Sequence, residues 1–118
     1  MSGLTRVTGP LLDVLEVLLT AYVVGNGEVH GWEIMKTTKR TGPTTYGVLD
    51  RLEQAEWIVG RWEEKESEDG KPRRRYYRLT PDGFAGAQKL LTERRPGWET
   101  PHLTPKPGLA LFRTSEAR

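Results

Sequence analysis

A basic segment, residues 71–78, holds the side chains of this chain that are best suited to bind phosphate. Taken as a β-strand with a period of two, its end places Tyr77 and Leu79 on one face and Arg74 and Arg78 on the other. Arginine neutralises the phosphates of DNA, so a strand with one packing face and one cationic face could be the wing of a winged-helix domain. An ordinary solvated antiparallel strand is the alternative interpretation of this segment.

The basic segment directly follows an acidic one, residues 63–69. The formal net charge is therefore only +2, so the distribution of charge, and not its total, has to support nucleic-acid binding. Asp69-Gly70 is a turn signal and residues 57–62 favour a strand, so the two segments should form a hairpin. We expect some carboxylates to pair with arginines across the hairpin. The expected DNA contacts, at its tip and on its returning strand, are Lys71, Arg73, Arg74 and Arg75.

Other kinds of chemistry find little support. The chain has no cysteine, and its two histidines, His30 and His102, lack the spacing of metal ligands. It also has no glycine-rich phosphate loop and no nucleophile elbow. We therefore expect no enzyme activity, metal or cofactor. The first residues have no apolar stretch typical of a signal peptide, which favours a cytoplasmic protein with no membrane segment.

A helix-turn-helix should precede the hairpin. One helix is expected over residues 32–39, and a second begins at Pro43 with Thr41 as its cap. Small hydroxyl residues at a helix N-terminus approach phosphate closely, and the backbone N–H groups there add to the attraction. Tyr46 could instead be a core aromatic with only its hydroxyl at the surface, and Arg51 could be merely solvated. The expected DNA-facing residues of this helix are Thr41, Thr44, Thr45, Tyr46 and Arg51.

The first helix, residues 10–25, is apolar on almost every side, because Asp13, Glu16 and Thr20 leave only a thin polar stripe. Such a helix has to be buried all round. We expect a second copy of the chain to cover the side that its own domain leaves open. A central helix covered by its own domain is the alternative. The expected dimer contacts on this helix are Leu11, Leu12, Leu15, Leu18, Leu19 and Tyr22.

The composition changes after a last predicted helix. That helix should begin after Thr80, which has N-cap chemistry, with Pro81 at its first position. Proline then recurs, so residues 96–118 should form an extended C-terminal tail. We expect an N-terminal arm over residues 1–9 and one domain over residues 10–95.

The chain has four tryptophans, which is many for 118 residues. Two of them, Trp32 and Trp98, are candidates for a pocket that binds a small aromatic effector at a dimer interface. Packing in the core is the alternative for each of them.

Three groups of residues, in this order and at these separations, resemble the PadR-type transcriptional regulators. They are His30-Gly31-Trp32-Glu33-Ile34, Tyr46-Gly47-Val48-Leu49-Asp50-Arg51-Leu52-Glu53, and Arg74-Arg75-Tyr76-Tyr77-Arg78-Leu79-Thr80 with Gly83. The resemblance covers roughly residues 10–94. It implies a dimeric winged-helix repressor that binds a roughly palindromic operator and is often released by a small molecule. It also implies dimer contacts through the first and last helices, which adds Phe84, Leu90 and Leu91.

The chain departs from the family pattern at two positions of the helix-turn-helix. Glu56 stands where the family usually has a glycine at the end of the recognition helix, and a non-glycine residue in a left-handed cap costs about 1 kcal/mol. Pro43 replaces another usual glycine just before that helix. The short last helix and the proline-rich tail make the chain similar to the compact subgroup of the family.

The expected fold is mainly α with a small β-hairpin (α+β), a winged helix-turn-helix of four helices plus a wing. The expected function is that of a dimeric, sequence-specific DNA-binding regulator. Its expected partners are double-stranded DNA with an inverted repeat, a second copy of the chain and a small aromatic effector. A winged-helix protein-interaction module without sequence-specific DNA binding is the alternative, because the same fold can present its wing and helices to a protein. A small-molecule carrier or enzyme built on a dimer pocket is the third.

Overall fold

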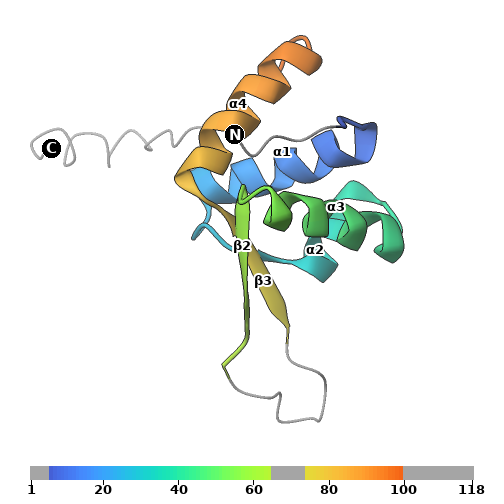
Figure 1. Cartoon of the computed structure of the whole chain (residues 1–118), viewed down its shortest axis with the longest axis vertical. Coiled ribbons are helices and arrows are strands. Elements are labelled where there is room, and N and C mark those ends of the chain that lie inside the picture. The colour runs from blue at the N-terminus through green and yellow to red at the C-terminus, as the bar shows by residue number, and fades with distance from the viewer. Residues whose placement is uncertain (1–5, 65–73, 100–118) are drawn as a thin grey trace, which may run out of the picture.

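The structure is a computed structural model that describes residues 6–64 and 74–99. Within these residues it is a winged helix-turn-helix of the expected α+β class, with four helices and a small antiparallel sheet (Figure 1). Lys71, Arg73 and most of the C-terminal tail lie outside the described residues. The elements in chain order are α1 (Gly9–Val24), β1 (Val29–His30), α2 (Gly31–Thr38), α3 (Gly42–Gln54), β2 (Ile58–Trp62), β3 (Arg75–Leu79) and α4 (Pro81–Arg94).

Helices α1, α3 and α4 each begin after a threonine, with a proline in the first two helical positions. The hydroxyls of Thr8, Thr41 and Thr80 each accept a hydrogen bond from the backbone N–H three residues on, at 3.2, 3.4 and 2.9 Å. The proline adds a backbone torsion that already suits a helical first turn. The predicted caps at Thr41 and Thr80 are therefore confirmed.

The sheet has the order β1-β3-β2, with β3 in the middle and antiparallel to both neighbours. Tyr77 pairs with Val29 of β1 and with Gly60 of β2, so the expected hairpin gains a third, two-residue strand. Tyr77 and Leu79 are buried while Arg78 is exposed, as the period-two pattern predicts. Strands β2 and β3 extend away from the helices (Figure 1). The buried side chains of Tyr77 and Leu79 on β3 anchor the wing in the core.

Helix α1 lies at the centre of the domain and contacts α2, α3, α4 and β3. These neighbours cover most of its apolar surface within a single copy of the chain, while Tyr22 and Val24 near its C-terminal end stay exposed. The assignment to a dimer interface is therefore wrong for six side chains, and the alternative of a helix covered by its own domain is right for them. The six buried side chains are Leu11, Leu12, Leu15, Leu18, Leu19 and, on α4, Leu91.

Three residues assigned to the dimer interface keep some exposed surface. Tyr22 is exposed, and Phe84 and Leu90 are partly buried against the core. Their role in a dimer stays a prediction.

None of the helices in the described segments is both long and apolar enough to cross a membrane.

Helix α3 ends in a left-handed turn at Glu56, whose φ is 64°. The backbone N–H groups of Glu56 and Trp57 donate to the carbonyl oxygens of Glu53 and Leu52, both at 3.0 Å. This pair of bonds is the Schellman arrangement, whose left-handed residue is usually glycine. The left-handed cap that the sequence suggests at Glu56 is therefore present, with a side chain in it.

Helix α4 starts directly on the backbone that leads into β2. A Cβ atom on Gly83 would lie 1.9 Å from the carbonyl oxygen of Trp57, so only glycine fits there. The same oxygen accepts a hydrogen bond from the Thr80 N–H at 2.9 Å. This contact sets where α4 begins relative to the base of the wing.

Candidate nucleic-acid interface

The N-terminal end of α3 presents exposed hydroxyl groups. Thr41 and Thr44 are both exposed, and the Thr41 hydroxyl donates to the Thr44 hydroxyl at 3.1 Å. Pro43 and Gly47, beside them, are exposed as well. The compact proline ring and the glycine leave the two hydroxyls accessible. Of the first-turn N–H groups, that of Thr44 already donates to the Thr41 hydroxyl and Pro43 has none, so the hydroxyls are the polar groups that this end presents. Such a small, hydroxyl-bearing helix end can approach a phosphate or a base edge closely.

Thr45 is turned the other way. It is fully buried and shares a helix face with Val48, Leu49 and Leu52, which are also buried. One position along a helix turns a side chain by about 100°, and this turn carries Thr45 from the exposed side of Thr44 onto the face that packs in the core. The prediction that Thr45 contacts DNA is therefore wrong. Its buried hydroxyl has no hydrogen-bond partner among the described residues.

Tyr46 connects the two helices of the helix-turn-helix. Its ring lies against Gly31, where an added Cβ atom would be 2.5 Å from the Tyr46 hydroxyl and 2.7 Å from Cε1. The side chain nevertheless stays 43% exposed. Both roles that the sequence allows are thus compatible with its position, and contact with DNA stays a prediction.

Arg51 lies about two and a half turns after the start of α3 and is partly buried. Its guanidinium donates a hydrogen bond to the backbone carbonyl of Arg6. The side chain therefore ties the start of the chain to α3, a link that the sequence does not predict. Its predicted contact with DNA remains untested by this arrangement.

Arg74 directly precedes β3, at the end of the wing away from the helices, and its side chain is exposed. Its backbone N–H donates to the Glu63 carboxylate at 2.9 Å, and its carbonyl oxygen accepts from the Glu63 N–H at 2.8 Å. The acidic segment is thus used here to hold the backbone of the returning strand. The arginine side chain is left on the outer side, where its predicted phosphate contact stays a prediction.

Arg75 is joined to the helices instead. Its Nη2 lies 3.0 Å from Glu53 Oε2 on α3, and its guanidinium carbon lies 5.2 Å from the ring centre of Trp62 and 5.6 Å from that of Tyr77. Arg75 has the same strand parity as Tyr77 and Leu79, so it belongs to the packing face. The period-two pattern contains this signal, and it argues against the assignment of Arg75 to DNA.

One ion pair on the outer face is absent from the sequence-based candidates. Arg61 of β2 donates to both oxygens of Glu28, with Nε–Oε2 at 2.6 Å and Nη2–Oε1 at 2.7 Å. Its guanidinium carbon also lies 5.0 Å from the ring centre of Tyr76. The hydrogen bond from Arg61 lowers the pKa of the Glu28 carboxyl. The partners are 33 residues apart in the chain, so no local pattern indicates the pair.

The two tryptophans predicted to form an effector pocket have different neighbours. Trp32, on α2, is 57% exposed, stacks with His30 at 6.1 Å between ring centres and lies 4.9 Å from the Lys36 ammonium. Trp98 packs partly buried against the core, and its ring N–H has no partner among the described residues. An apolar groove between α1 and α2 is lined by neither of them. A pocket shared by Trp32 and Trp98 therefore stays a prediction.

Comparison with known proteins places this geometry in context. Residues 20–89 match the transcriptional regulator PadR-like family. The chain is similar to the crystal structure of smu.1704 from Streptococcus mutans UA159, with 26% identity, 76% of this chain and 82% of that one covered, and a TM-score of 0.56. It is also similar to a PadR family transcription regulator from Clostridium difficile R20291, with 25% identity, coverage of 74% and 88%, and a TM-score of 0.57.

A further likeness concerns the fold alone. The Staphylococcus aureus MepR-DNA complex has a TM-score of 0.57 at 22% identity, with 73% of this chain and 63% of that chain covered. Comparison with curated protein sequences gives no match.

Proposed function

The chain belongs to the PadR-like family of transcriptional regulators, and we propose that it is a dimeric repressor that binds an inverted-repeat DNA operator. The observation that carries the proposal is the pairing of an exposed, hydroxyl-bearing helix end at Thr41 and Thr44 with an outward-facing Arg74 on the wing. A winged helix uses these two parts for the major groove and for the backbone beside it. MepR, which has this fold, was solved in complex with DNA.

We propose that α3 reads the bases and the wing positions the domain. Thr41 and Thr44 would meet the base edges or phosphates of the major groove, and Tyr46 would border them on the same helix. Arg74, together with Lys71 and Arg73, would neutralise phosphates. Contacts of the second kind carry no sequence information but make affinity fall steeply with salt concentration.

The dimer surface is proposed to lie around Tyr22 of α1 and Phe84 and Leu90 of α4. The Tyr22 and Phe84 rings stack with centres 4.5 Å apart and an interplanar angle of 17°, and Tyr22 is 37% exposed. A second copy that covers this aromatic pair would bring two α3 helices to one side of the dimer. Two such helices about one DNA turn, or 34 Å, apart would favour half-sites about 10 bp apart.

The proposal includes a small aromatic effector. A small aromatic molecule bound between the copies would release the operator by changing the separation of the two α3 helices. Trp32 and Trp98 are the candidate contacts, because aromatic side chains often line such pockets.

One observation favours a protein-interaction module as the second candidate function. Arg61 is paired with Glu28 and Arg75 with Glu53, so part of the positive charge near the wing is already neutralised within the domain. Such a surface would suit a protein partner better than a polyanion.

Fluorescence anisotropy with the DNA upstream of the protein's own gene, against a scrambled duplex, distinguishes the two candidates. Measurements at two salt concentrations report the number of phosphates neutralised. Tight, selective and salt-sensitive binding would support the regulator. Weak and equal binding to both duplexes, with a shallow salt slope, would favour the interaction module.

A further inference from the structure

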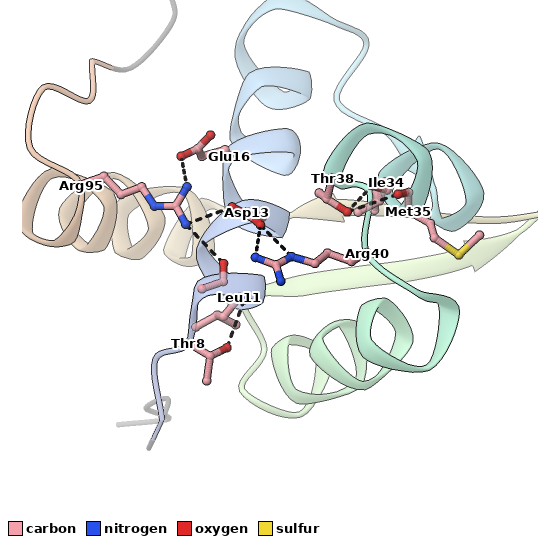
Figure 2. Close-up of polar contacts among 10 residues, drawn as sticks. Thr8, Leu11, Asp13, Glu16, Ile34, Met35, Thr38, Arg40 and Arg95 are labelled. Carbon is pink, nitrogen blue, oxygen red and sulfur yellow. Dashed lines mark hydrogen bonds and ion pairs between the residues drawn. The ribbon is translucent and has the colours of Figure 1, made fainter.

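One carboxylate joins three elements behind the reading helix. Asp13 of α1 lies between Arg40, which follows α2, and Arg95, which follows α4 (Figure 2). Arg40 donates through Nε at 2.9 Å, and its Nη2 lies 2.7 Å from the same oxygen, Asp13 Oδ2. Arg95 Nη2 lies 3.0 Å from the other oxygen, Oδ1. The two arginines therefore share the carboxylate without competing for an oxygen.

The positions of the two arginines in the chain give this cluster its importance. Arg40 immediately precedes Thr41, the cap of α3, and so belongs to the turn that aims the exposed end of that helix. Arg95 caps the C-terminal end of α4, where its own N–H donates to the Leu91 carbonyl oxygen at 2.8 Å. Asp13 is thus the point at which the end of α4 meets the turn before the reading helix.

Arg95 is held firmly on the Asp13 side. Its Nη1 donates to Glu16 Oε2 at 2.7 Å, and its Nη2 also donates to the carbonyl oxygen of Gly9 at 3.3 Å. Burial lowers the pKa of Arg95, but the hydrogen bonds to Asp13 and Glu16 outweigh it and raise the pKa overall. Asp13 is 23% exposed and Arg95 31%, so water screens these contacts less than on an open surface.

We infer that Asp13 is a positioning residue for DNA binding, which makes the aim of the α3 N-terminus depend on where the end of α4 lies. Arg95 orients the carboxylate through Oδ1, and the oriented Oδ2 then holds the side chain of Arg40 and the turn that leads to Thr41. When Arg95 moves away, the carboxylate loses its fixed orientation and the turn loosens. Loosening a binding surface before contact weakens binding, because the complex has to order it again. This inference rests on the proposed DNA-binding function.

Arg95 provides the sharper test, because Arg40 lies close enough to the reading helix to touch DNA itself. We expect Arg95→Met to weaken operator affinity about five- to tenfold, within the usual range of coupling between sites. In an Arg40→Met background the same change should weaken it less than about twofold, since the link is already broken. Lys89→Met, which removes an exposed positive charge from α4, is the matched control and should bind like the wild type. Equal effects of Arg95→Met in both backgrounds would overturn the inference.

A second measurement needs no DNA. In 15N-labelled protein we expect Arg95→Met and Asp13→Asn to shift the backbone amide resonances of Thr41 and Thr44, while Lys89→Met leaves them in place. The asparagine keeps the shape of Asp13 but has only one acceptor oxygen for two arginines. Amide resonances of Thr41 and Thr44 that stay unchanged in both variants would refute the link.

The two arms separate this inference from the proposed function. If the wild-type protein binds no duplex selectively, the proposed function fails, and the amide shifts alone decide whether Asp13 connects α4 to the turn. Should Arg95→Met not fold, Arg95→Lys keeps the charge but loses the planar fork that reaches both carboxylates, and it is expected to give the same shifts in weaker form.

Discussion

Replacing Glu56 by glycine should stabilise the domain, because this residue closes α3 in a left-handed conformation with φ at 64°. A residue with a Cβ atom loses about 1–2 kcal/mol in that region of backbone space. Glycine removes this cost, but its greater freedom in the unfolded chain takes back about 0.5–1 kcal/mol. The net gain for Glu56→Gly is therefore about 1 kcal/mol in the free energy of unfolding, which for a domain of this size raises Tm by about 4 °C.

Relief of charge repulsion is the competing explanation for any gain at this position. Glu56 lines the same groove as Glu53 and Asp82, so losing its carboxylate alone could stabilise the protein. Glu56→Ala is the matched control, since it removes the charge but keeps the Cβ atom in the left-handed conformation. We expect its free energy of unfolding to stay within about 0.5 kcal/mol of the wild type.

Urea unfolding followed by circular dichroism, together with the Tm of each variant, gives both numbers. If the backbone at Glu56 is strained, the glycine variant is more stable than the alanine variant by about 1 kcal/mol. Equal stability of the two variants, whether raised or not, would show that the left-handed turn stores no strain that glycine can remove.

Five further substitutions test the site and the packing beneath it. Thr45→Val should stabilise the domain by about 1 kcal/mol, because it removes a buried hydroxyl with no partner among the described residues, and operator affinity should not change. Thr44→Ala should alter base preference or affinity in a binding-site selection with little loss of Tm; wild-type binding would move the reading surface elsewhere. Gly83→Ala should lower the free energy of unfolding by about 3 kcal/mol, since its Cβ atom would lie 1.9 Å from a backbone oxygen. In the same unfolding assay Gly47→Ala should raise it by about 0.5–1 kcal/mol, because the added Cβ atom meets no atom within 4 Å. Arg74→Ala should weaken binding to all duplexes and flatten the salt dependence in anisotropy, and an unchanged slope would remove this side chain from the phosphate contacts.

Features that depend only on neighbouring residues can be predicted from the sequence. A threonine followed by proline marked the caps at Thr41 and Thr80, because the cap bond reaches only three residues along the chain. The period of two placed Tyr77 and Leu79 in the core, because successive side chains of a strand point to opposite faces. The left-handed turn at Glu56 is predicted instead from the family resemblance, which places a glycine at this position, and local hydrogen bonds close it.

For two predicted DNA contacts, Thr45 and Arg75, the local repeat of buried positions indicates packing instead. Thr45 lies at helical spacing from Val48 and Leu52, which predicts a buried position, and Arg75 has the strand parity of the packing face. In both cases the chemical character of the side chain, a hydroxyl or a cation, favours contact with DNA, whereas its place in the repeat favours packing. The period of the element sets which side chains are buried, and a buried polar side chain is then either hydrogen-bonded or left without a partner.

The sequence does not show what covers a surface or which distant side chains meet. These features depend on how the chain folds as a whole. An apolar α1 has to be buried, but its pattern is the same whether its own domain or a second copy covers it. Here α2, α3, α4 and β3 cover most of it and leave Tyr22 and Val24 exposed. Likewise Asp13 meets Arg40 across 27 residues, and Glu16 meets Arg95 across 79. The physical reason is that hydrophobic periodicity reports which side of an element avoids water, whereas the chain topology sets which elements lie on that side.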